Sequence, residues 1–190
     1  MFDILIKGGD NLKIGIDIDD TITDTRKSTI EYLNMYNLDL NEYSGDLNDK
    51  KTFDFLIKHI EDIQANANLK PGVKEAFAEL KKMGYEIIII TARGGELDYN
   101  HEKITKDYFA KHDLPYDKMY FGNYPKGDIA LKEKIDVFID DRIYNLDDVS
   151  QHGIECLHFV NDMNIITPYK KFDNWDDIIL YLKNRGLYEK

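Results

Sequence analysis

The sequence predicts an α/β fold in which a parallel sheet is flanked by helices, and three observations predict it. Strand-like apolar runs alternate with amphipathic helical stretches along the chain. Two of the runs, YEIIII at 85–90 and IDVFI at 135–139, are almost continuously apolar, which is typical of parallel strands buried on both faces. Acidic or hydroxyl side chains follow the runs at the strand ends. Alternating strands and helices pair in parallel through right-handed crossovers.

The chain opens with two expected strands, residues 2–6 and the run KIGIDI at 13–18, joined by a Gly-Gly-Asp-Asn turn. Whether residues 2–6 join the sheet is left open. After Pro71 a new helix is expected, with Gly84 as its stop. The later elements are a helix at 73–83, the strand at 85–90, a helix at 99–111, a short apolar segment at 119–121, the strand at 135–139, a helix at 146–151, a strand at 154–160 and a helix at 175–184.

The first two sheet strands are separated by more chain than one crossover needs. About 70 residues lie between Thr21 and Thr91, whereas a strand–helix–strand unit takes about 30. The surplus falls in residues 24–69, where helical runs at 26–36 and 52–65 flank a polar stretch at 41–51. The sequence therefore predicts a helical insertion directly after the first central strand.

Composition favours a soluble globular protein and argues against several classes of partner. The 190 residues are 43% hydrophobic and 32% charged, with a formal net charge of −11. This charge disfavours binding to nucleic acid polymers through a broad basic face. Neither a membrane-spanning apolar run nor a signal peptide is recognised. The single cysteine, Cys156, lies in an apolar run and suits a reducing cytoplasm, so we expect a cytoplasmic protein and a core cysteine.

The first central strand ends in Asp17-Ile18-Asp19-Asp20-Thr21, the most informative feature of the chain. Two carboxylates next to a buried strand are costly unless a cation or a proton compensates them. Mg²⁺ is a suitable cation, because it prefers oxygen ligands and is often shared between carboxylates and a phosphate. The sequence therefore predicts a Mg²⁺ and phosphate site here.

Two other strands also end in polar groups. Thr91-Ala92-Arg93 follows the run at 85–90, and Asp140-Asp141 ends the run at 135–139. Ligands of open α/β sheets bind outside the carboxyl ends of the strands, so these groups should gather with the Asp17 segment. Response-regulator receivers also combine acids, Thr and Lys, but place the acids in a different order.

These segments resemble the four motifs of the haloacid dehalogenase (HAD) superfamily of phosphotransferases. The D-x-D-x-T at 17–21 resembles motif I, Thr91 motif II, Lys126 motif III and Asp140-Asp141 motif IV. The resemblance covers nearly the whole chain. It implies a Rossmannoid core domain formed by residues 1–23 and 70–190, with residues 24–69 as a small helical cap over the site.

The resemblance also implies a role for each matching residue. Asp17 would be the nucleophile that forms an aspartyl-phosphate, and Asp19 the general acid and base. Thr91 and backbone N–H groups around Ala92 would hold the phosphoryl oxygens, while Lys126 would neutralise nucleophile and phosphate. The implied cofactor is Mg²⁺, held by Asp17, the Asp19 backbone carbonyl and the motif IV acids.

Some assignments stay open. Asp141 is the expected direct metal ligand, with Asp140 acting through water or Lys126, but the reverse order is also considered. Arg93 would either contact substrate or pair with an acid of the cap. Asp20 replaces the commoner Gly of motif I and would face solvent or cap the next helix. The cap aromatics are expected in the core, with one or two facing a flat substrate: Tyr32, Tyr36, Tyr43, Phe53 and Phe55.

The resulting expectation is a Mg²⁺-dependent phosphatase of small phosphate monoesters. The short cap and the I-D-D-R at 139–142 look most like the cytosolic-type 5'(3')-deoxyribonucleotidases and their bacterial relatives, which implies a nucleoside monophosphate as substrate. The alternatives are a sugar-phosphate or other metabolite phosphatase on the same machinery, and a non-catalytic Mg²⁺-binding regulator with a HAD fold. The oligomeric state and the physiological substrate are not fixed by the sequence.

Overall fold

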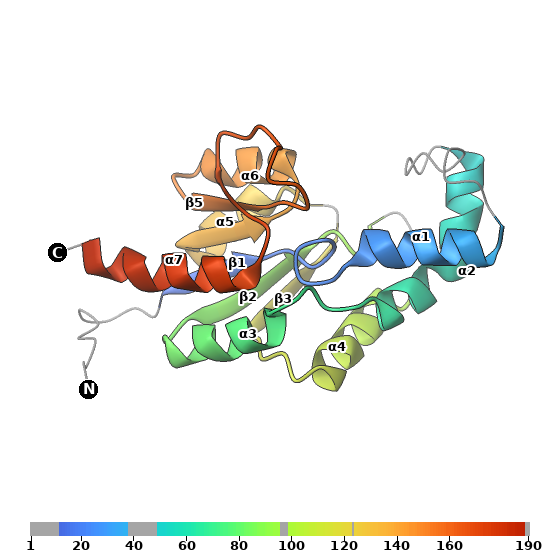
Figure 1. Ribbon diagram of the computed structural model, residues 1–190, viewed down its shortest axis with the longest axis horizontal. Coiled ribbons are helices and arrows are strands. Elements are labelled where there is room, and N and C mark those ends of the chain that lie inside the picture. Colours follow the sequence, from blue (N-terminus) through green and yellow to red (C-terminus); the bar gives the residue numbers. More distant parts are fainter. Residues whose placement is uncertain (1–11, 38–48, 96–98, 123, 189–190) are drawn as a thin grey trace.

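The computed structural model describes residues 12–37, 49–95, 99–122 and 124–188. It contains a six-stranded, wholly parallel sheet with the strand order β3-β2-β1-β4-β5-β6. The elements are β1 Lys13–Ile16, α1 Thr25–Met35, α2 Lys50–Asn66, α3 Val73–Lys82, β2 Glu86–Thr91, α4 His101–Lys111, β3 Lys118–Phe121, α5 Lys126–Glu133, β4 Val137–Asp140, α6 Ile143–Ser150, β5 Glu155–Phe159, β6 Lys170–Phe172 and α7 Trp175–Tyr188 (Figure 1).

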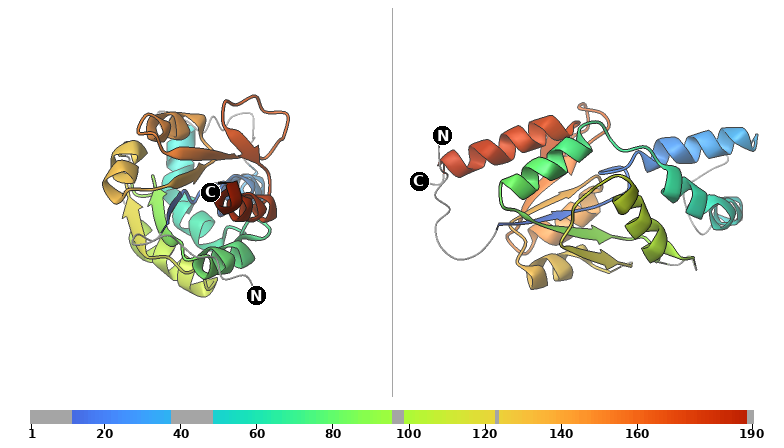
Figure 2. Two further views of the ribbon diagram at one scale, coloured as in Figure 1. Left: turned by 90° about the vertical axis from the view of Figure 1, so that its left-hand side faces the viewer. Right: turned by 90° about the horizontal axis from the view of Figure 1, so that it is seen from below.

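Helices cover both faces of the sheet, as the apolar strands require. Along β2, Ile87 and Ile89 point to one face while Ile88 and Ile90 point to the other. The first face packs against apolar side chains of α3, α4 and α7, among them Phe77, Phe109 and Trp175. The second packs against Ala130, Leu146 and Val149 of α5 and α6. Figure 2 shows helices on both sides of the sheet. The result is a three-layered α/β domain.

Gly15 of β1 shows how closely the centre of the sheet is packed. A Cβ atom at this position would lie 2.6 Å from the Phe138 ring and 2.7 Å from the Ile135 side chain. Glycine therefore lets the Phe138 ring pack directly on the central strand. That ring belongs to the apolar cluster under α5 and α6.

α1 and α2 lie beyond the carboxyl ends of the strands (Figure 1). They have an apolar cluster of their own, in which Leu33 of α1 packs with Phe55 and Ile63 of α2. Two antiparallel connections join them to the sheet, bridged at Thr23 and Leu69. This position is the one that the expected insertion would take. That residues 24–69 form a separate cap domain is a proposal.

Most expected elements appear within a few residues of their predicted bounds. Gly84 follows α3 with a φ of 85°, in agreement with its expected role as a helix stop. The sequence analysis did not foresee α5, whose first residue is Lys126, nor the short edge strand β6. The strand expected at 2–6 lies outside the described residues. No helix in the described part combines the length and the apolar character that crossing a bilayer requires.

Candidate active site

The polar residues at the strand ends meet at one edge of the sheet. β1 and β4 are paired in parallel, and the Asp17 N–H donates to the Ile139 carbonyl at 3.0 Å, just beyond β1. Asp140 is the last residue of β4, and Thr91 is the last of β2 on the other side of β1. All three side chains are buried. Parallel pairing therefore brings residues from three distant segments to the carboxyl edge, as expected.

Lys126 connects two of these acids. Its Nζ lies 2.5 Å from an Asp17 oxygen and 2.7 Å from an Asp140 oxygen, and all three residues are almost fully excluded from solvent. The two carboxylates raise the pKa of Lys126 above its ordinary value despite the opposing effect of burial. The ammonium thus stays charged and compensates two buried anions.

The carboxylate of Asp140 is held from several directions. Besides Lys126, it accepts the Arg142 N–H at 2.8 Å, and the Asn145 amide lies 3.0 and 3.1 Å from its two oxygens. Its side chain has no solvent exposure. These contacts fix the turn between β4 and α6 and leave Asp140 with most of its acceptor capacity used.

Asp17, Asp140 and Asp141 each offer a carboxylate oxygen, and these oxygens lie within 4.8 Å of one another. Burial raises the pKa of Asp17 to about 7, against the attraction of Lys126 and with further repulsion from neighbouring aspartates. Burial and the charges of Asp17 and Asp140 raise the pKa of Asp141 to about 8. One lysine therefore does not compensate the cluster, and its all-oxygen donor set fits a divalent cation such as Mg²⁺.

Asp19 is turned to a different partner. Arg93 donates from Nη2 and Nε to the two Asp19 oxygens at 2.7 and 3.0 Å, and Thr25 donates to the first of them at 2.7 Å. Although partial burial opposes it, Arg93 holds the pKa of Asp19 below its ordinary value. The third guanidinium nitrogen donates to Thr105 at 3.2 Å, and the Arg93 side chain is fully buried. Among the described residues Arg93 thus forms its ion pair with Asp19, a partner that neither of its two expected roles named.

Asp20 caps the following helix, one of its two expected roles. It is buried, and its carboxylate accepts the Arg26 N–H in the first turn of α1 at 2.9 Å. Its φ of 60° lies in the left-handed region, which favours Gly but tolerates Asp. The backbone conformation thus explains why Gly is common here, and the hydrogen bond explains what Asp adds.

Other residues lie at the rim of the site or away from it. Arg142 is largely exposed and pairs with Asp141 of the acid cluster at 3.1 Å. Cys156 is a buried free thiol whose pKa burial raises to about 12, as expected of a core cysteine. Of the aromatic residues expected in the cap, Phe55 is buried and Tyr36 is about half exposed, and both rings contact His59. Tyr43 lies outside the described residues.

Four contacts of the site were not foreseen: those of Thr25, Thr105, Asn145 and His158. Asn145 and Thr25 occupy the first turns of helices that follow motif segments, a weak signal that was available. Thr105 and His158 carry no recognisable signal, because they reach the site from α4 and β5 only through tertiary packing.

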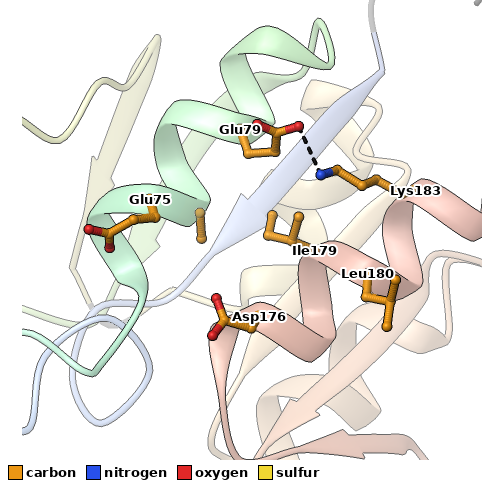
Figure 3. A pocket seen from close by; sticks show the side chains of 7 residues that line it. Glu75, Glu79, Asp176, Ile179, Leu180 and Lys183 are labelled. Carbon is orange, nitrogen blue, oxygen red and sulfur yellow. Dashed lines mark ion pairs between the residues drawn. The ribbon is translucent and has the colours of Figure 1, made fainter. Parts of the chain in front are cut away.

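A surface pocket of about 360 Å³ lies away from this edge, between α3 and α7. Figure 3 shows that its acidic side chains come from the two helices, and Glu79 is paired with Lys183 at 2.9 Å. All of its lining residues belong to these two helices, and none is among the polar residues at the carboxyl ends of β1, β2 and β4. We therefore place the candidate site at the acid cluster and not in this pocket.

Comparison with solved structures identifies the fold. YfnB from Bacillus subtilis, a putative HAD hydrolase solved with magnesium, matches with a TM-score of 0.63 over 92% of this chain and 99% of its own, at 12% identity. CbbY from Rhodobacter sphaeroides, solved with phosphate, matches with a TM-score of 0.61 over 89% and 96%, at 15% identity. The fold is that of the HAD hydrolases. The neighbours also include a dehalogenase, with a TM-score of 0.66, 10% identity and coverage of 91% and 98%.

Sequence comparison adds no closer relative. No protein-family model matches the chain, and no curated protein matches it. At these identities the structural likeness establishes the fold alone. Because dehalogenases share this fold with other hydrolases, the reaction has to be argued from the site.

Proposed function

We propose that the protein is a Mg²⁺-dependent phosphatase that hydrolyses small phosphate monoesters through an aspartyl-phosphate on Asp17. The observation that carries the proposal is the buried Asp17–Lys126–Asp140 arrangement beside Asp141. Phosphoryl transfer depends mainly on positioning and on compensation of charge. A lysine and a cation next to a carboxylate nucleophile would offset the repulsion between that carboxylate and the negative phosphoryl group. A substrate without a phosphate carries less negative charge and would need less of this compensation.

Asp17 and Asp141 are the proposed side-chain ligands of Mg²⁺, together with the Asp19 backbone carbonyl. Asp140 is the less suitable ligand, because Lys126, Asn145 and the Arg142 N–H already contact its carboxylate. We assign it to holding Lys126. When bound, Mg²⁺ would neutralise charge between the carboxylates and the phosphoryl group. CbbY, one of the similar structures, binds phosphate, and YfnB binds magnesium.

The proposed reaction has two steps. An Asp17 oxygen attacks phosphorus, the ester P–O bond breaks, and the leaving oxygen takes a proton from Asp19. To donate it, Asp19 would have to be protonated when the substrate is bound, although Arg93 favours its ionised form in this structure. Water then attacks phosphorus and gives a proton to Asp19, which releases inorganic phosphate and restores Asp17. The Thr91 hydroxyl and backbone N–H groups around Ala92 would hold the phosphoryl oxygens. In this scheme Lys126 stays protonated throughout and reduces the repulsion between the carboxylate and the phosphate.

For the substrate we favour a nucleoside monophosphate, on the basis of the short helical insertion and the I-D-D-R segment. The single cysteine, a buried free thiol, favours a protein of the cytoplasm. A sugar phosphate is the alternative, and it is favoured by the CbbY structure in complex with xylulose 1,5-bisphosphate. Both substrates would use the same catalytic groups, so only the residues facing the leaving group would distinguish them.

The test is phosphate release across a panel of nucleoside monophosphates and sugar phosphates, with Mg²⁺, with Ca²⁺ and with chelator. We expect activity with Mg²⁺ only, since Ca²⁺ accepts a looser oxygen shell that would let Asp17 bind it through both oxygens. A nucleotidase should favour nucleotides at least about tenfold in kcat/KM, or roughly 1.4 kcal/mol. Equal rates with sugar phosphates would reject the nucleotidase assignment. Full activity in chelator would reject the proposal that turnover requires Mg²⁺.

Arg93 is proposed to position Asp19. Replacing Arg93 with lysine should lower kcat by about tenfold or more for alkyl phosphates, because lysine cannot reproduce the two-oxygen contact. Hydrolysis of 4-nitrophenyl phosphate, whose leaving group needs no proton, should fall much less. The pKa of Asp19 should rise once Arg93 is gone, and the pH profile of kcat for alkyl phosphates would record this change. Equal losses for both substrates would contradict a role through Asp19.

A further inference from the structure

We propose that His158 is a positioning residue of the Mg²⁺ site, which holds the peptide carbonyl of Asp141 and thereby fixes where the Asp141 carboxylate stands. The inference rests on the proposed function, because it concerns the cation that Asp141 would bind. His158 belongs to β5, outside all four motif segments. Its hydrogen bond in the described structure goes to the Asp141 backbone, so its effect would pass through Asp141.

The geometry comes from strand pairing. His158 of β5 is the register partner of Asp140 at the end of β4. Its Nε2 lies 3.0 Å from the Asp141 carbonyl oxygen, and the residue is only 3% exposed. A carbonyl oxygen can only accept, so Nε2 carries the proton and donates it. The imidazole therefore secures the turn from the neighbouring strand.

The other ring nitrogen makes the choice of histidine informative. Among the described residues, His158 Nδ1 is buried and has no hydrogen-bond partner. A buried polar atom without a partner is unfavourable, so packing alone would prefer an apolar side chain here. The hydrogen bond from Nε2 to Asp141 is the contact that an apolar side chain could not supply.

The two acids of the turn are thus held in different ways. Asp140 is fixed through its carboxylate, by Lys126 and Asn145. Asp141 is fixed through its backbone, by His158, while its carboxylate contacts the exposed Arg142. The carboxylate of Asp141 is therefore available to a cation while its main chain stays in place. Groups that orient a metal ligand in this way typically change metal affinity by about 10- to 100-fold when they are removed.

The experiment compares His158→Leu, His158→Gln and His158→Asn by Mg²⁺ titration calorimetry. The Leu variant loses the donor, and we expect its Kd for Mg²⁺ to rise about 10-fold or more. Gln can place an amide nitrogen near the position of Nε2, so its Kd should stay within about threefold of the parent. Asn is shorter and should behave like Leu. If the Leu variant does not fold, the inference is tested by comparing the Mg²⁺ Kd of the Gln variant with that of the Asn variant.

Cys156→Ala is the matched control. Cys156 lies two residues earlier on β5, is also buried, and contacts the Leu146 carbonyl of α6 through its thiol at 3.5 Å. This variant should lose thermal stability while keeping the Mg²⁺ Kd of the parent. An unchanged Kd in folded His158→Leu, or in Asn when Leu is unfolded, would overturn the inference. So would a parent protein that does not bind Mg²⁺. A parent that binds Mg²⁺ but hydrolyses no phosphate ester would refute the proposed function and leave this inference intact.

Discussion

Replacing Asp17 with asparagine should abolish turnover, with a loss on the order of 10⁴-fold or more, the scale seen when a nucleophile is removed. Asparagine nearly matches the shape of the buried carboxylate but is a poor nucleophile, so no aspartyl-phosphate would form. The measurement is the steady-state rate of phosphate release with Mg²⁺, alongside circular dichroism to verify the fold. Substantial activity in a folded Asp17→Asn protein would exclude the covalent mechanism.

The same variant should be more stable than the parent when no metal is bound. Burial raises the pKa of Asp17 from 3.8 to about 7, so its ionised form disfavours the folded state. This cost appears as the pH rises above about 4 and is complete above about 7, because only then is Asp17 charged in both states. Asp17→Asn should thus raise the melting temperature at pH 8 and change it little at pH 4. A lower melting temperature at pH 8 would contradict the crowded acid cluster.

Replacing Lys126 with methionine should have the largest effect on stability. Methionine keeps much of the length of the side chain but leaves Asp17 and Asp140 without the cation that lies 2.5 and 2.7 Å away. Breaking a buried ion pair from one side typically costs about 3–5 kcal/mol. We expect a loss of that size in the free energy of unfolding at pH 8, measured by urea denaturation without metal. The loss should shrink in acid, where the aspartates become neutral, and turnover should vanish.

Lys118→Met provides the matched control. Lys118 also connects two carboxylates, those of Glu133 at 2.6 Å and Glu86 at 3.3 Å, but its side chain is 44% exposed. Water screens such a pair, so its loss should lower the free energy of unfolding far less than the loss of Lys126 does, and it should leave turnover unchanged. If both methionine variants lose the same stability, burial of the Lys126 cluster is not what makes Lys126 important.

The sequence by itself determined the fold class and the edge of the sheet where polar residues gather. Uninterrupted apolar runs such as 85–90 belong to strands buried on both faces, and parallel strands bring their carboxyl ends to one edge. Asp17, Thr91 and Asp140 could therefore be placed together before any contact was known. The helix α5 was missed, although its N-terminal residue Lys126 was selected for its place between motifs.

Only the tertiary structure decided which charged groups pair with which. Lys126 reaches Asp17 across 109 residues of sequence, and Arg93 reaches Asp19 across 74. His158 depends on the register of β5 against β4. Such partners have no fixed spacing along the chain, because they are chosen by strand order, register and helix packing. Periodicity reports which face of an element is buried, whereas a hydrogen bond between distant side chains exists only once the sheet has brought them within about 3 Å.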